Sequence, residues 1–531
     1  MKYKVCITAA GIGSRVSSIS KNNKALLPIN NQSVISKIIG KFDKKIEIII
    51  AVGYQKKKVI DFVKIAHKDR KIKFVEISNY NKPGSGPGLS LLKCRKYLNC
   101  PFIFIACDTL VEEKIPSPKN NWIGISKVED PESYLIVEKN SKNDVTRFFD
   151  KRSKNFLYWN GYANHEFLCF IGLAGVKDYK VFWNSLSKNK TLNNGELQVS
   201  NGLDSLKNYK IKCLKFKWFD TGNEYNYNRA LEHFGGNKVL PKPDEYFYKE
   251  KDIVIKYFKS NEKAYKRKKR SIFLKNSIPN LINSGDNYLA YQYANGELLS
   301  DIKDIKVFIK FLKFMKKNFW NQKINNKKIL NSIRASCHLF YKRKTFDRVD
   351  FFMKRSGIKD NQNIINSITV PKIYNLLEQI DWKEFCNPRP VIFHGDLQPE
   401  NIVVNKNKFT LLDWREDFGG LLKYGDIYYD FGKLHHALII NGKIIRAEKY
   451  IINVNKNRIQ YNFTKRNHLI KYLKILESFS DEIGLNIKKL RIMSSLIYLN
   501  IAPLHHYPYS ELLYYHGKLS LFNVLNNEWK I

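Results

Sequence analysis

Apolar and polar positions follow two patterns along residues 1–235. Short β-rich runs alternate with amphipathic stretches that have helical spacing. The pattern predicts strands at 4–9, 46–52, 73–77, 102–107, 122–126, 167–173 and 211–219, and helices at 34–42, 56–66, 89–98 and 177–186. Such alternation favours an α/β domain with a doubly wound, mostly parallel sheet, in which ligands bind at the carboxyl ends of the strands.

A break in this pattern separates two domains. Turn-forming residues and two prolines crowd residues 236–243, which we interpret as a linker after the first domain. Residues 244–299 combine strand-like runs with a basic, helix-compatible segment, and residues 300–531 are mainly helical. The β-like runs lie at 252–258, 288–294, 391–393, 402–404 and 409–412. We therefore expect an α+β second domain with a small lobe and a larger helical lobe.

Composition narrows the class of protein. The chain has 531 residues, too many for one hydrophobic core, and 44% of them are hydrophobic. A formal net charge of +43 would ordinarily indicate nucleic acid or an anionic membrane surface as partner. Lysines are spread along the whole chain, so we interpret the charge as a solvated basic surface and expect no nucleic-acid partner. Nucleic-acid binding stays as a rival interpretation, which salt-dependent retention on DNA would test.

The eight cysteines are scattered and form no CxxC pair, which is typical of reduced core residues in a cytoplasmic protein. No apolar run is long enough to span a bilayer. The apolar run at the N-terminus is short and lacks a cleavage pattern, so we interpret it as a buried first strand and not as a signal peptide.

A glycine-containing loop follows the first predicted strand, with the sequence AAGIGSR at residues 9–15. Glycines let the backbone approach a triphosphate closely, and backbone N–H groups of such a loop bind phosphate oxygens. Arg15 and Lys24 carry positive charge for the β and γ phosphates, and we regard them as catalytic candidates. The nucleotide-binding candidates in this loop are Ala10, Gly11, Gly13 and Ser14.

Two carboxylates end predicted strands in the same domain, Asp108 after 102–107 and Asp220 after 211–219. Such a pair suits one Mg²⁺ that bridges the α phosphate and the incoming phosphate oxygen. The alternative is a sheet protein in which both carboxylates only cap turns or helices.

Four pieces in order, AAGIGSR, KALLPI, the strand-terminal CD and WFDTGNEYNYNRAL, resemble the sugar-phosphate and phosphocholine nucleotidyltransferase superfamily. The resemblance covers about residues 1 to 234 and implies a GT-A-like fold. It also implies that a substrate phosphate attacks the α phosphorus of an NTP and that pyrophosphate leaves. CTP is favoured over other NTPs without being fixed. The candidates for the acceptor pocket are Lys151, Glu166 and Glu196.

The second domain carries the sequence HGDLQPEN at 394–401, followed by Asp413 at the end of an apolar run. In this pattern Asp396 activates a hydroxyl, and Asn401 and Asp413 are oxygen ligands for Mg²⁺. The structural alternative is a buried, hydrogen-bonded hairpin. The chemistry that the pattern predicts is phosphoryl transfer.

This stretch resembles the aminoglycoside phosphotransferase and choline kinase superfamily, and GDIYYDFGKL at 425–434 is similar to a helix of bacterial capsule-associated members. The resemblance implies that Lys256 binds the α and β phosphates of ATP, and that Tyr291 and Tyr293 lie at the adenine-binding hinge. Two features depart from the family pattern. No glycine-rich loop precedes Lys256, and residues 264–276 contain no acid to pair with it, so that Glu262 is the nearest candidate.

The two resemblances together predict a bifunctional enzyme. With ATP and Mg²⁺ it would phosphorylate a small alcohol, choline-like, polyol or sugar, and couple the phosphate to CTP or another NTP. The product would be an NDP-activated precursor for surface polysaccharide. The alternatives are a sugar 1-kinase joined to a uridylyltransferase, and one active module joined to a silent binding domain. The acceptor, the base and the oligomeric state stay open.

Overall fold

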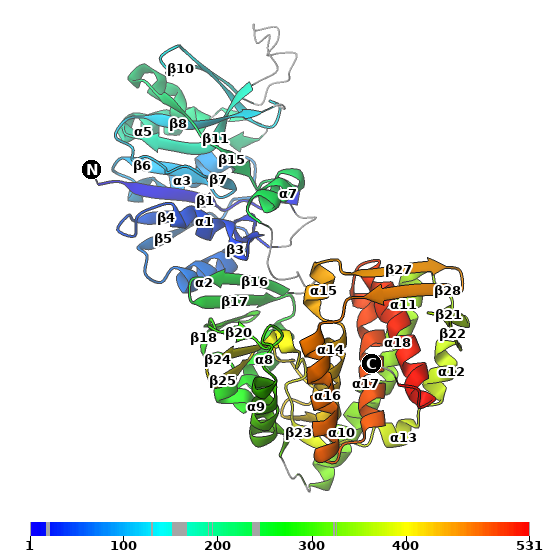
Figure 1. Cartoon of the computed structure of the whole chain (residues 1–531). Coiled ribbons are helices and arrows are strands. Elements are labelled where there is room, and N and C mark those ends of the chain that lie inside the picture. The colour runs from blue at the N-terminus through cyan, green and yellow to red at the C-terminus, as the bar shows by residue number, and fades with distance from the viewer. Residues whose placement is uncertain are drawn as a thin grey trace. The chain divides into compact units, whose positions relative to one another are not determined.

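The computed structural model describes residues 2–16, 22–128, 131–150, 167–189, 191–193, 195–235, 245–321, 324 and 326–529. The chain forms two compact units, Met1–Tyr257 and Phe258–Ile531, shown with their elements in Figure 1. The division falls inside β17 (Ile253–Phe258), and the predicted linker at 236–243 lies outside the described residues. The predicted domain boundaries therefore stay a prediction.

The hairpin of β16 (Glu245–Glu250) and β17 belongs to the first unit because its side chains are held there. The hydroxyl of Tyr248 donates to the Leu26 carbonyl at 2.5 Å, and the backbone N–H of Ser33 donates to Glu250 at 3.3 Å. Tyr248 is fully buried, with its ring edge-on to Phe62 at 5.0 Å.

A single large sheet forms the centre of the first unit. Its main path runs β10-β9-β11-β6-β1-β4-β5, with β8 pairing β11 and β14. Neighbouring strands are parallel from β6 to β5, whereas β11 runs antiparallel to β6. The bounds are β1 (Lys4–Ala9), β4 (Ile48–Val52), β5 (Ile72–Glu76), β6 (Phe102–Ala106), β8 (Trp122–Val128), β9 (Leu135–Lys139), β10 (Val145–Asp150), β11 (Phe167–Val176) and β14 (Lys212–Lys215). The predicted α/β class with a mostly parallel sheet is confirmed.

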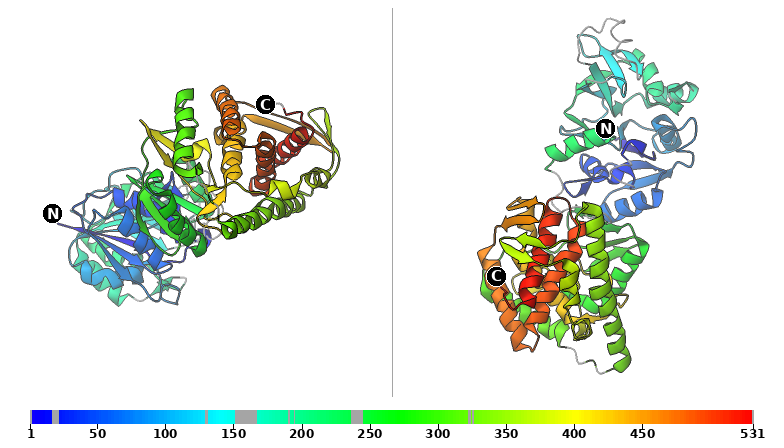
Figure 2. Two further views of the ribbon diagram at one scale, coloured as in Figure 1. Left: turned by 90° about the horizontal axis from the view of Figure 1, so that it is seen from below. Right: turned by 90° about the vertical axis from the view of Figure 1, so that its right-hand side faces the viewer.

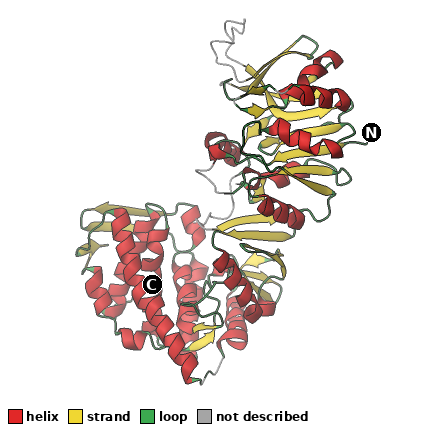
Figure 3. Ribbon diagram, turned by 180° about the vertical axis from the view of Figure 1, so that it is seen from behind, coloured by secondary structure: helices red, strands yellow, loops and turns green. Residues whose placement is uncertain are grey.

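Helices pack on the faces of this sheet (Figure 3). Every residue of β4 is buried, as expected for a parallel strand covered on both sides. Phe102 on β6 stacks on Trp183 at 5.0 Å, and substituting such a buried ring by alanine costs about 3–5 kcal/mol. The helices are α1 (Val34–Gly40), α2 (Lys56–Ala66), α3 (Pro87–Cys94), α5 (Tyr179–Lys188), α6 (Ser200–Leu203) and α7 (Glu224–His233).

Several elements of the first unit differ from the sequence prediction, among them β9 and β10, which were not predicted. The strand expected at 211–219 is divided into β14 and β15 (Trp218–Asp220), because β14 pairs β8 while β15 pairs β7 (Thr109–Val111). Helix α7 was not predicted, although Asn223 caps it by accepting from the Asn226 N–H at 2.9 Å.

The second unit is mainly helical, as expected. Helices α14, α16, α17 and α18 pack against one another, and Figures 1 and 2 show them side by side. The helices are α8 (Asn261–Leu274), α9 (Ile305–Met315), α10 (Lys327–Cys337), α11 (Lys344–Ser356), α12 (Ile373–Glu378), α13 (Trp382–Phe385), α14 (Ile427–Ile439), α15 (Gly442–Arg446), α16 (Asn467–Glu482), α17 (Ile487–Ile501) and α18 (Tyr509–Leu525). No helix in the described ranges is both long and apolar enough to cross a bilayer.

Short strands flank the HGDLQPEN segment of this unit. The pair β23–β26 and the three-stranded sheet β20-β24-β25 stand at the two ends of the HGDLQPEN segment. A hairpin, β27–β28, was missed within a region predicted as helical, and β21 and β22 extend it. The bounds are β18 (Leu281–Ser284), β19 (Tyr288–Gln292), β20 (Glu297–Leu298), β21 (Asn363–Ile365), β22 (Ile368–Val370), β23 (Pro390–Ile392), β24 (Ile402–Asn405), β25 (Lys408–Leu411), β26 (Tyr424–Asp426), β27 (Tyr450–Asn455) and β28 (Arg458–Phe463).

Candidate active sites

The glycine-containing loop of the first unit is fixed at its base by Asn23. This fully buried side chain donates to the carbonyl oxygens of Ala9 at 3.1 Å and Tyr54 at 2.8 Å. Gly13 has a positive φ of 70°, and a Cβ there would lie 3.3 Å from the Lys24 side chain. Among the residues that the structure describes, a Cβ on Gly11 would meet nothing within 4 Å, which leaves room for a ligand there.

The pairing of β7 with β15 brings the two predicted metal ligands together. Asp220 lies opposite Thr109, and the N–H of Thr221 donates to the Asp108 carbonyl at 2.9 Å. A Cβ built on Gly222 would lie 2.9 Å from a carboxylate oxygen of Asp220 and 3.0 Å from one of Asp108. The same point is 3.7 Å from Nη2 of Arg15, so the loop and both strand ends converge on one small volume.

Of the two carboxylates in this volume, Asp108 forms an ion pair with Lys24. Lys24 places Nζ 2.6 Å from Oδ2 of Asp108. Burial alone would raise the pKa of Asp108, but the ammonium of Lys24 holds it below its ordinary value. Burial would likewise lower the pKa of Lys24, and the carboxylate of Asp108 raises it instead. Lys24 and Asp108 therefore both stay charged near neutral pH.

Within the described ranges, Asp220 forms no such ion pair with a cation, although Arg15 lies near it. Burial and the nearby charge of Asp108 raise its pKa, although Gly222 donates to Oδ1 at 2.7 Å and Tyr134 donates to Oδ2 at 3.0 Å. Two close carboxylates whose mutual repulsion is not fully offset fit a divalent cation with oxygen ligands. Sequence reasoning missed Tyr134, because no motif marks a tyrosine that is brought in by tertiary contact.

The acceptor candidates of the first unit remain untested. Lys151 and Glu166 lie outside the described residues. Glu196 begins β13 (Glu196–Leu197) and accepts a hydrogen bond from Gln198 at 3.0 Å. Its Cβ lies 3.0 Å from the point where Gly86 would carry a Cβ, so it packs against the loop before α3.

In the second unit, Asp430 of α14 holds the start of the HGDLQPEN segment in place. Its carboxylate accepts from the N–H of His394 at 2.9 Å and from the N–H of Gly395 at 2.7 Å. Gly395 has a φ of 87°, a conformation that favours glycine. Burial raises the pKa of Asp430 to about 6 even though the two N–H groups oppose the shift. Sequence reasoning quoted this residue in the helix motif without giving it a role.

His394 is a neutral positioning group. It is fully buried, and burial lowers its pKa to about 4. Its Nδ1 accepts from the N–H of Asp396 at 3.3 Å, so the proton of the neutral ring belongs on Nε2. The ring thereby fixes the backbone of the predicted catalytic aspartate.

The side chain of Asp396 is oriented by its neighbours. Gln398 donates to Oδ1 at 3.0 Å, and Lys433 of α14 places Nζ 2.8 Å from the same oxygen. Asn401 donates to the Asp396 carbonyl at 2.9 Å and is tied to the next loop, because its own carbonyl accepts from Leu412 at 2.7 Å. The β24–β25 pairing thus holds Asn401 beside the strand end that carries Asp413. Lys433 is a further residue of this site that its place in the sequence did not reveal.

Helix α8 supplies cations to the loop after Asp413. Nη1 of Arg267 lies 2.6 Å from Oδ1 of Asp413, and Lys266 pairs with Asp417 at 2.7 Å. Arg270 is fully buried and donates to the main-chain carbonyls of Phe393 and His394. Helix α8 begins at Asn261, before the acid-free segment 264–276, and it therefore contains Glu262. Its basic residues bind the loop after Asp413.

Lys256 finds its carboxylate on the neighbouring strand. Its Nζ lies 2.6 Å from Oε2 of Glu245, with 9% and 3% of the two side chains exposed. Glu262, which the sequence suggested as a substitute partner, pairs with Lys266 at 2.7 Å. Tyr291 is buried on β19, with its ring 6.3 Å from that of Trp414, and Tyr293 follows the strand. The nucleotide-binding roles of these residues stay predictions.

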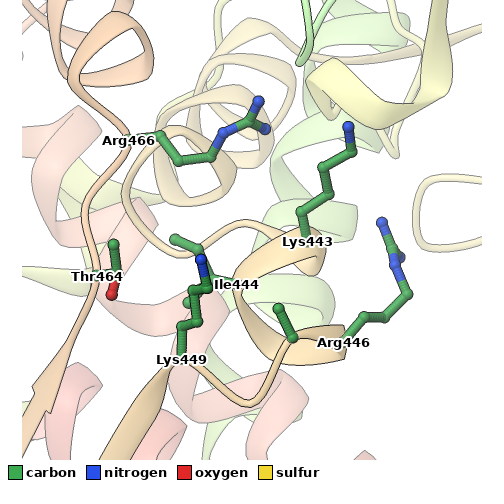
Figure 4. A pocket seen from close by; sticks show the side chains of 7 residues that line it. Lys443, Ile444, Arg446, Lys449, Thr464 and Arg466 are labelled. Carbon is green, nitrogen blue, oxygen red and sulfur yellow. The ribbon is translucent and has the colours of Figure 1, made fainter.

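A basic pocket of about 460 Å³ lies around α15, lined by Lys443, Arg446, Lys449 and Arg466 (Figure 4). Carboxylates offset much of its charge. Asp301 pairs with Lys443 at 2.6 Å and with Arg466 at 3.4 Å, and Glu400 pairs with Arg446 at 3.4 Å. We assign this pocket no role.

The pairing of β23 with β26 and of β24 with β25 lies inside residues 372–449, which match the model of the phosphotransferase enzyme family. The second unit contains a phosphotransferase-family domain. The match includes Asp396, Asn401, Asp413 and Lys433. In the described residues, no three His, Cys, Asp or Glu side chains gather as a closed metal site. Oxygen donors such as Asn401 and Asp413 suit Mg²⁺, which keeps water and phosphate ligands of its own.

The N-terminal region matches nucleotidyltransferases. The bifunctional protein GlmU of Methanococcus maripaludis is 26% identical over 243 residues, which cover 44% of this chain and 55% of that protein. The chain spans about half the length of the curated relatives it matches. A solved inositol-1-phosphate CTP transferase from T. maritima is 14% identical, with a TM-score of 0.34, and covers 45% of this chain and 98% of that one. The chain thus joins a region that is similar to GlmU to a domain that matches the phosphotransferase enzyme family.

Proposed function

We propose that this protein is a bifunctional enzyme that activates an alcohol in two steps. The phosphotransferase domain transfers the γ-phosphoryl group of ATP to the alcohol. The nucleotidyltransferase domain couples the resulting phosphate to an NTP, with CTP favoured, and releases pyrophosphate. The product is an NDP-activated alcohol, which we expect to serve surface polysaccharide synthesis on the basis of the resemblance of residues 425–434.

In the first step Asp396 accepts the proton of the acceptor hydroxyl. The hydroxyl oxygen then forms a bond to the γ phosphorus, and the bond from that phosphorus to the bridging oxygen of ADP breaks. Asn401 and Asp413 would hold Mg²⁺, which would neutralise charge on the phosphates. The observation that carries this step is the fixed position of Asp396, held through His394 and Lys433.

In the second step a phosphate oxygen of the product attacks the α phosphorus of the NTP, and the bond to the pyrophosphate oxygen breaks. Lys24 and Arg15 would neutralise the phosphates, and Asp108 and Asp220 would hold Mg²⁺. Support comes from the convergence of these groups on the point beside Gly222. Positioning and charge neutralisation are sufficient here, because no covalent intermediate is required.

Two other functions remain in competition. A sugar 1-kinase joined to a uridylyltransferase would use the same site chemistry with UTP. The other function is that of a silent binding domain, in which the phosphotransferase domain binds its ligand without turnover. The Arg267–Asp413 ion pair favours this alternative because it occupies a predicted metal ligand. The two functions differ in product: the first gives a UDP-sugar, whereas the second gives no phosphorylated alcohol.

The test is a product analysis by mass. The protein is incubated with Mg²⁺, ATP and either CTP or UTP, together with a panel of alcohols or of their phosphates. We expect alcohol phosphate with ATP alone, and NDP-alcohol when an NTP is added. A protein that binds nucleotides but forms neither product from any acceptor would contradict the proposal.

A further inference from the structure

Four basic side chains lie close enough to interact with one another: Lys344 and Arg348 of α11, Arg415 two residues after Asp413, and Lys433 of α14. We call them the basic cluster. Lys433 is fixed to Asp396 at 2.8 Å, and 9% of its side chain is exposed. Lys344 and Arg348 stand one helical turn apart, so they lie on the same face of α11.

One aromatic ring links this helix face to the catalytic segment. The ring centroid of Phe340 lies 4.0 Å from Nζ of Lys344 and 4.7 Å from the guanidinium carbon of Arg415. Arg415 in turn packs on the residue before Asp396, because a Cβ on Gly395 would lie 2.7 Å from the Arg415 Cβ. The N–H of Arg415 also donates to the His394 carbonyl at 3.0 Å. Three elements thus bring positive charge to the same side of the catalytic loop.

In the described part of the chain, acids lie beside Lys433 and Arg415 but form no ion pair with Lys344 or Arg348. Among the described residues, neither Lys344 nor Arg348 makes a side-chain hydrogen bond or an ion pair, although both are half-buried. Arg415 has Glu416 as its nearest acid, at 3.9 Å, and its buried Nε finds no acceptor within the described ranges. Burial, and then the charges of Arg415, Lys433 and Arg348, lower the pKa of Lys344 well below its ordinary value.

Clustered cations with too few acids are costly unless an anion joins them. The basic pocket of Figure 4 is different, since three of its four cations have carboxylate partners. The loop that carries Asp413 is different as well, because Arg267 and Lys266 are both paired there with aspartates. The basic cluster can therefore bind a negatively charged group, whereas most of the cations of the other two regions are already paired with carboxylates.

We infer that the acceptor alcohol carries a carboxylate or a phosphate, which binds Lys344, Arg348 and Arg415 while its hydroxyl faces Asp396. This inference rests on the proposed phosphotransferase function and narrows its acceptor. A cationic amino alcohol of the choline type would be repelled by the same side chains, and a neutral polyol would gain nothing from them.

The first arm of the test compares acceptors of one size and different charge with the full-length protein. Glycerol, glycerate, glycerol phosphate and choline form one series, and ribitol, ribonate and ribitol phosphate form a second. We expect kcat/KM with an anionic member to exceed that of the neutral member by at least tenfold, and choline to be the poorest. The carboxylate and phosphate members identify which anion is preferred.

The second arm measures binding without turnover. Inorganic phosphate is titrated calorimetrically into the wild type, Lys344→Gln, Arg348→Gln, and the control Lys449→Gln from the pocket of Figure 4. Losing a hydrogen bond to a charged group weakens binding about tenfold to hundredfold, so each cluster variant should lose phosphate affinity and raise the KM of an anionic acceptor. The control and the KM for ATP should be unchanged.

Each failure has a distinct signature. Neutral or cationic acceptors that are phosphorylated as well as anionic ones, or cluster variants that match Lys449→Gln in both arms, would overturn the inference and leave the phosphotransferase function standing. A raised KM for ATP in the cluster variants would place ATP at the cluster and overturn it too. Absence of transfer to every acceptor, with phosphate binding retained, would instead refute the proposed function. The wild-type acceptor series needs no variant to fold.

Discussion

Arg267 and Asp413 form an ion pair at the predicted metal site of the second unit, with Nη1 2.6 Å from Oδ1 and with 7% and 17% of the side chains exposed. The guanidinium of Arg267 and a bound Mg²⁺ would both interact with the carboxylate of Asp413. Binding of the metal therefore requires that Arg267 give up or share an oxygen of Asp413. The competition arises because α8 places an arginine, Arg267, beside this carboxylate.

Replacing Arg267 by glutamine should lower the Mg²⁺ concentration needed for half-maximal phosphoryl transfer, by about threefold to tenfold, because a competing charge has been removed. The matched control is Lys266→Gln, one position away, which loses contacts with Asp417 and Glu262. Mg²⁺ titrations of the two variants at fixed ATP give the comparison. An unchanged or higher Mg²⁺ requirement in Arg267→Gln would show that the arginine does not compete with the metal.

The ion pair of Lys256 with Glu245 is the second feature that a variant can test. Both side chains are almost fully buried, so removing one partner leaves an uncompensated charge. We expect Glu245→Gln alone or Lys256→Met alone to lower the free energy of unfolding by about 3–5 kcal/mol, and the double variant to lose less than the sum. Urea unfolding of the four proteins measures this. Additive losses would mean that the pair is not coupled.

Lys256 also bears on ATP. If it binds the α and β phosphates, Lys256→Met should weaken ATP binding in a calorimetric titration beyond any effect of Glu245→Gln, which keeps the lysine. Submicromolar ATP affinity that is the same in both variants would remove the nucleotide role from Lys256.

Asp430 and His394 should influence stability in opposite directions with pH. The raised pKa of Asp430, about 6, means that the folded state holds its proton more tightly, so stability falls as pH rises from about 4 to 6. The lowered pKa of His394, about 4, means that stability is lost as pH falls from about 6.5 to 4.

Single substitutions should separate these two effects. The free energy of unfolding of Asp430→Asn, relative to the wild type, should rise as pH rises from about 4 to 6. That of His394→Gln, relative to the wild type, should fall as pH rises from about 4 to 6.5, because the variant lacks the ring that favours the folded state when neutral. Each trend amounts to about 3 kcal/mol, since each pKa is shifted by a little over two units and one unit corresponds to about 1.4 kcal/mol. Unfolding free energies at several pH values are the measurement. Curves parallel to the wild type would contradict the burial of these groups.

Local patterns were sufficient for much of the fold. The strand at 4–9 was predicted with its observed bounds, and so was the helix at 56–66, because runs of buried residues and amphipathic spacing are written in consecutive positions. The division of 211–219 into β14 and β15 was not predictable in this way. It depends on two different partner strands that lie far away in the sequence.

The candidate sites show the same division. Motifs pointed to Asp108, Asp220 and Asp396, whose residue types and neighbours carry a chemical signature. Tyr134, Glu245 and Lys433 carry none, since a tyrosine, a glutamate and a lysine gain their roles only when tertiary pairing brings them to a carboxylate or an ammonium. The anion capacity of the basic cluster is of this kind too, because it arises from cations on three separate elements.

The most direct test of the two-step account is complementation between two variants, each lacking one predicted site. Asp396→Asn should lose alcohol phosphorylation by two to four orders of magnitude and keep nucleotidyl transfer to a supplied alcohol phosphate. Asp108→Asn should do the reverse. Neither variant alone should convert free alcohol, ATP and an NTP to NDP-alcohol, and mixing the two folded proteins should restore that product, detected by mass. Failure of the mixture, or loss of both partial reactions in one folded variant, would contradict two separate sites that act in sequence.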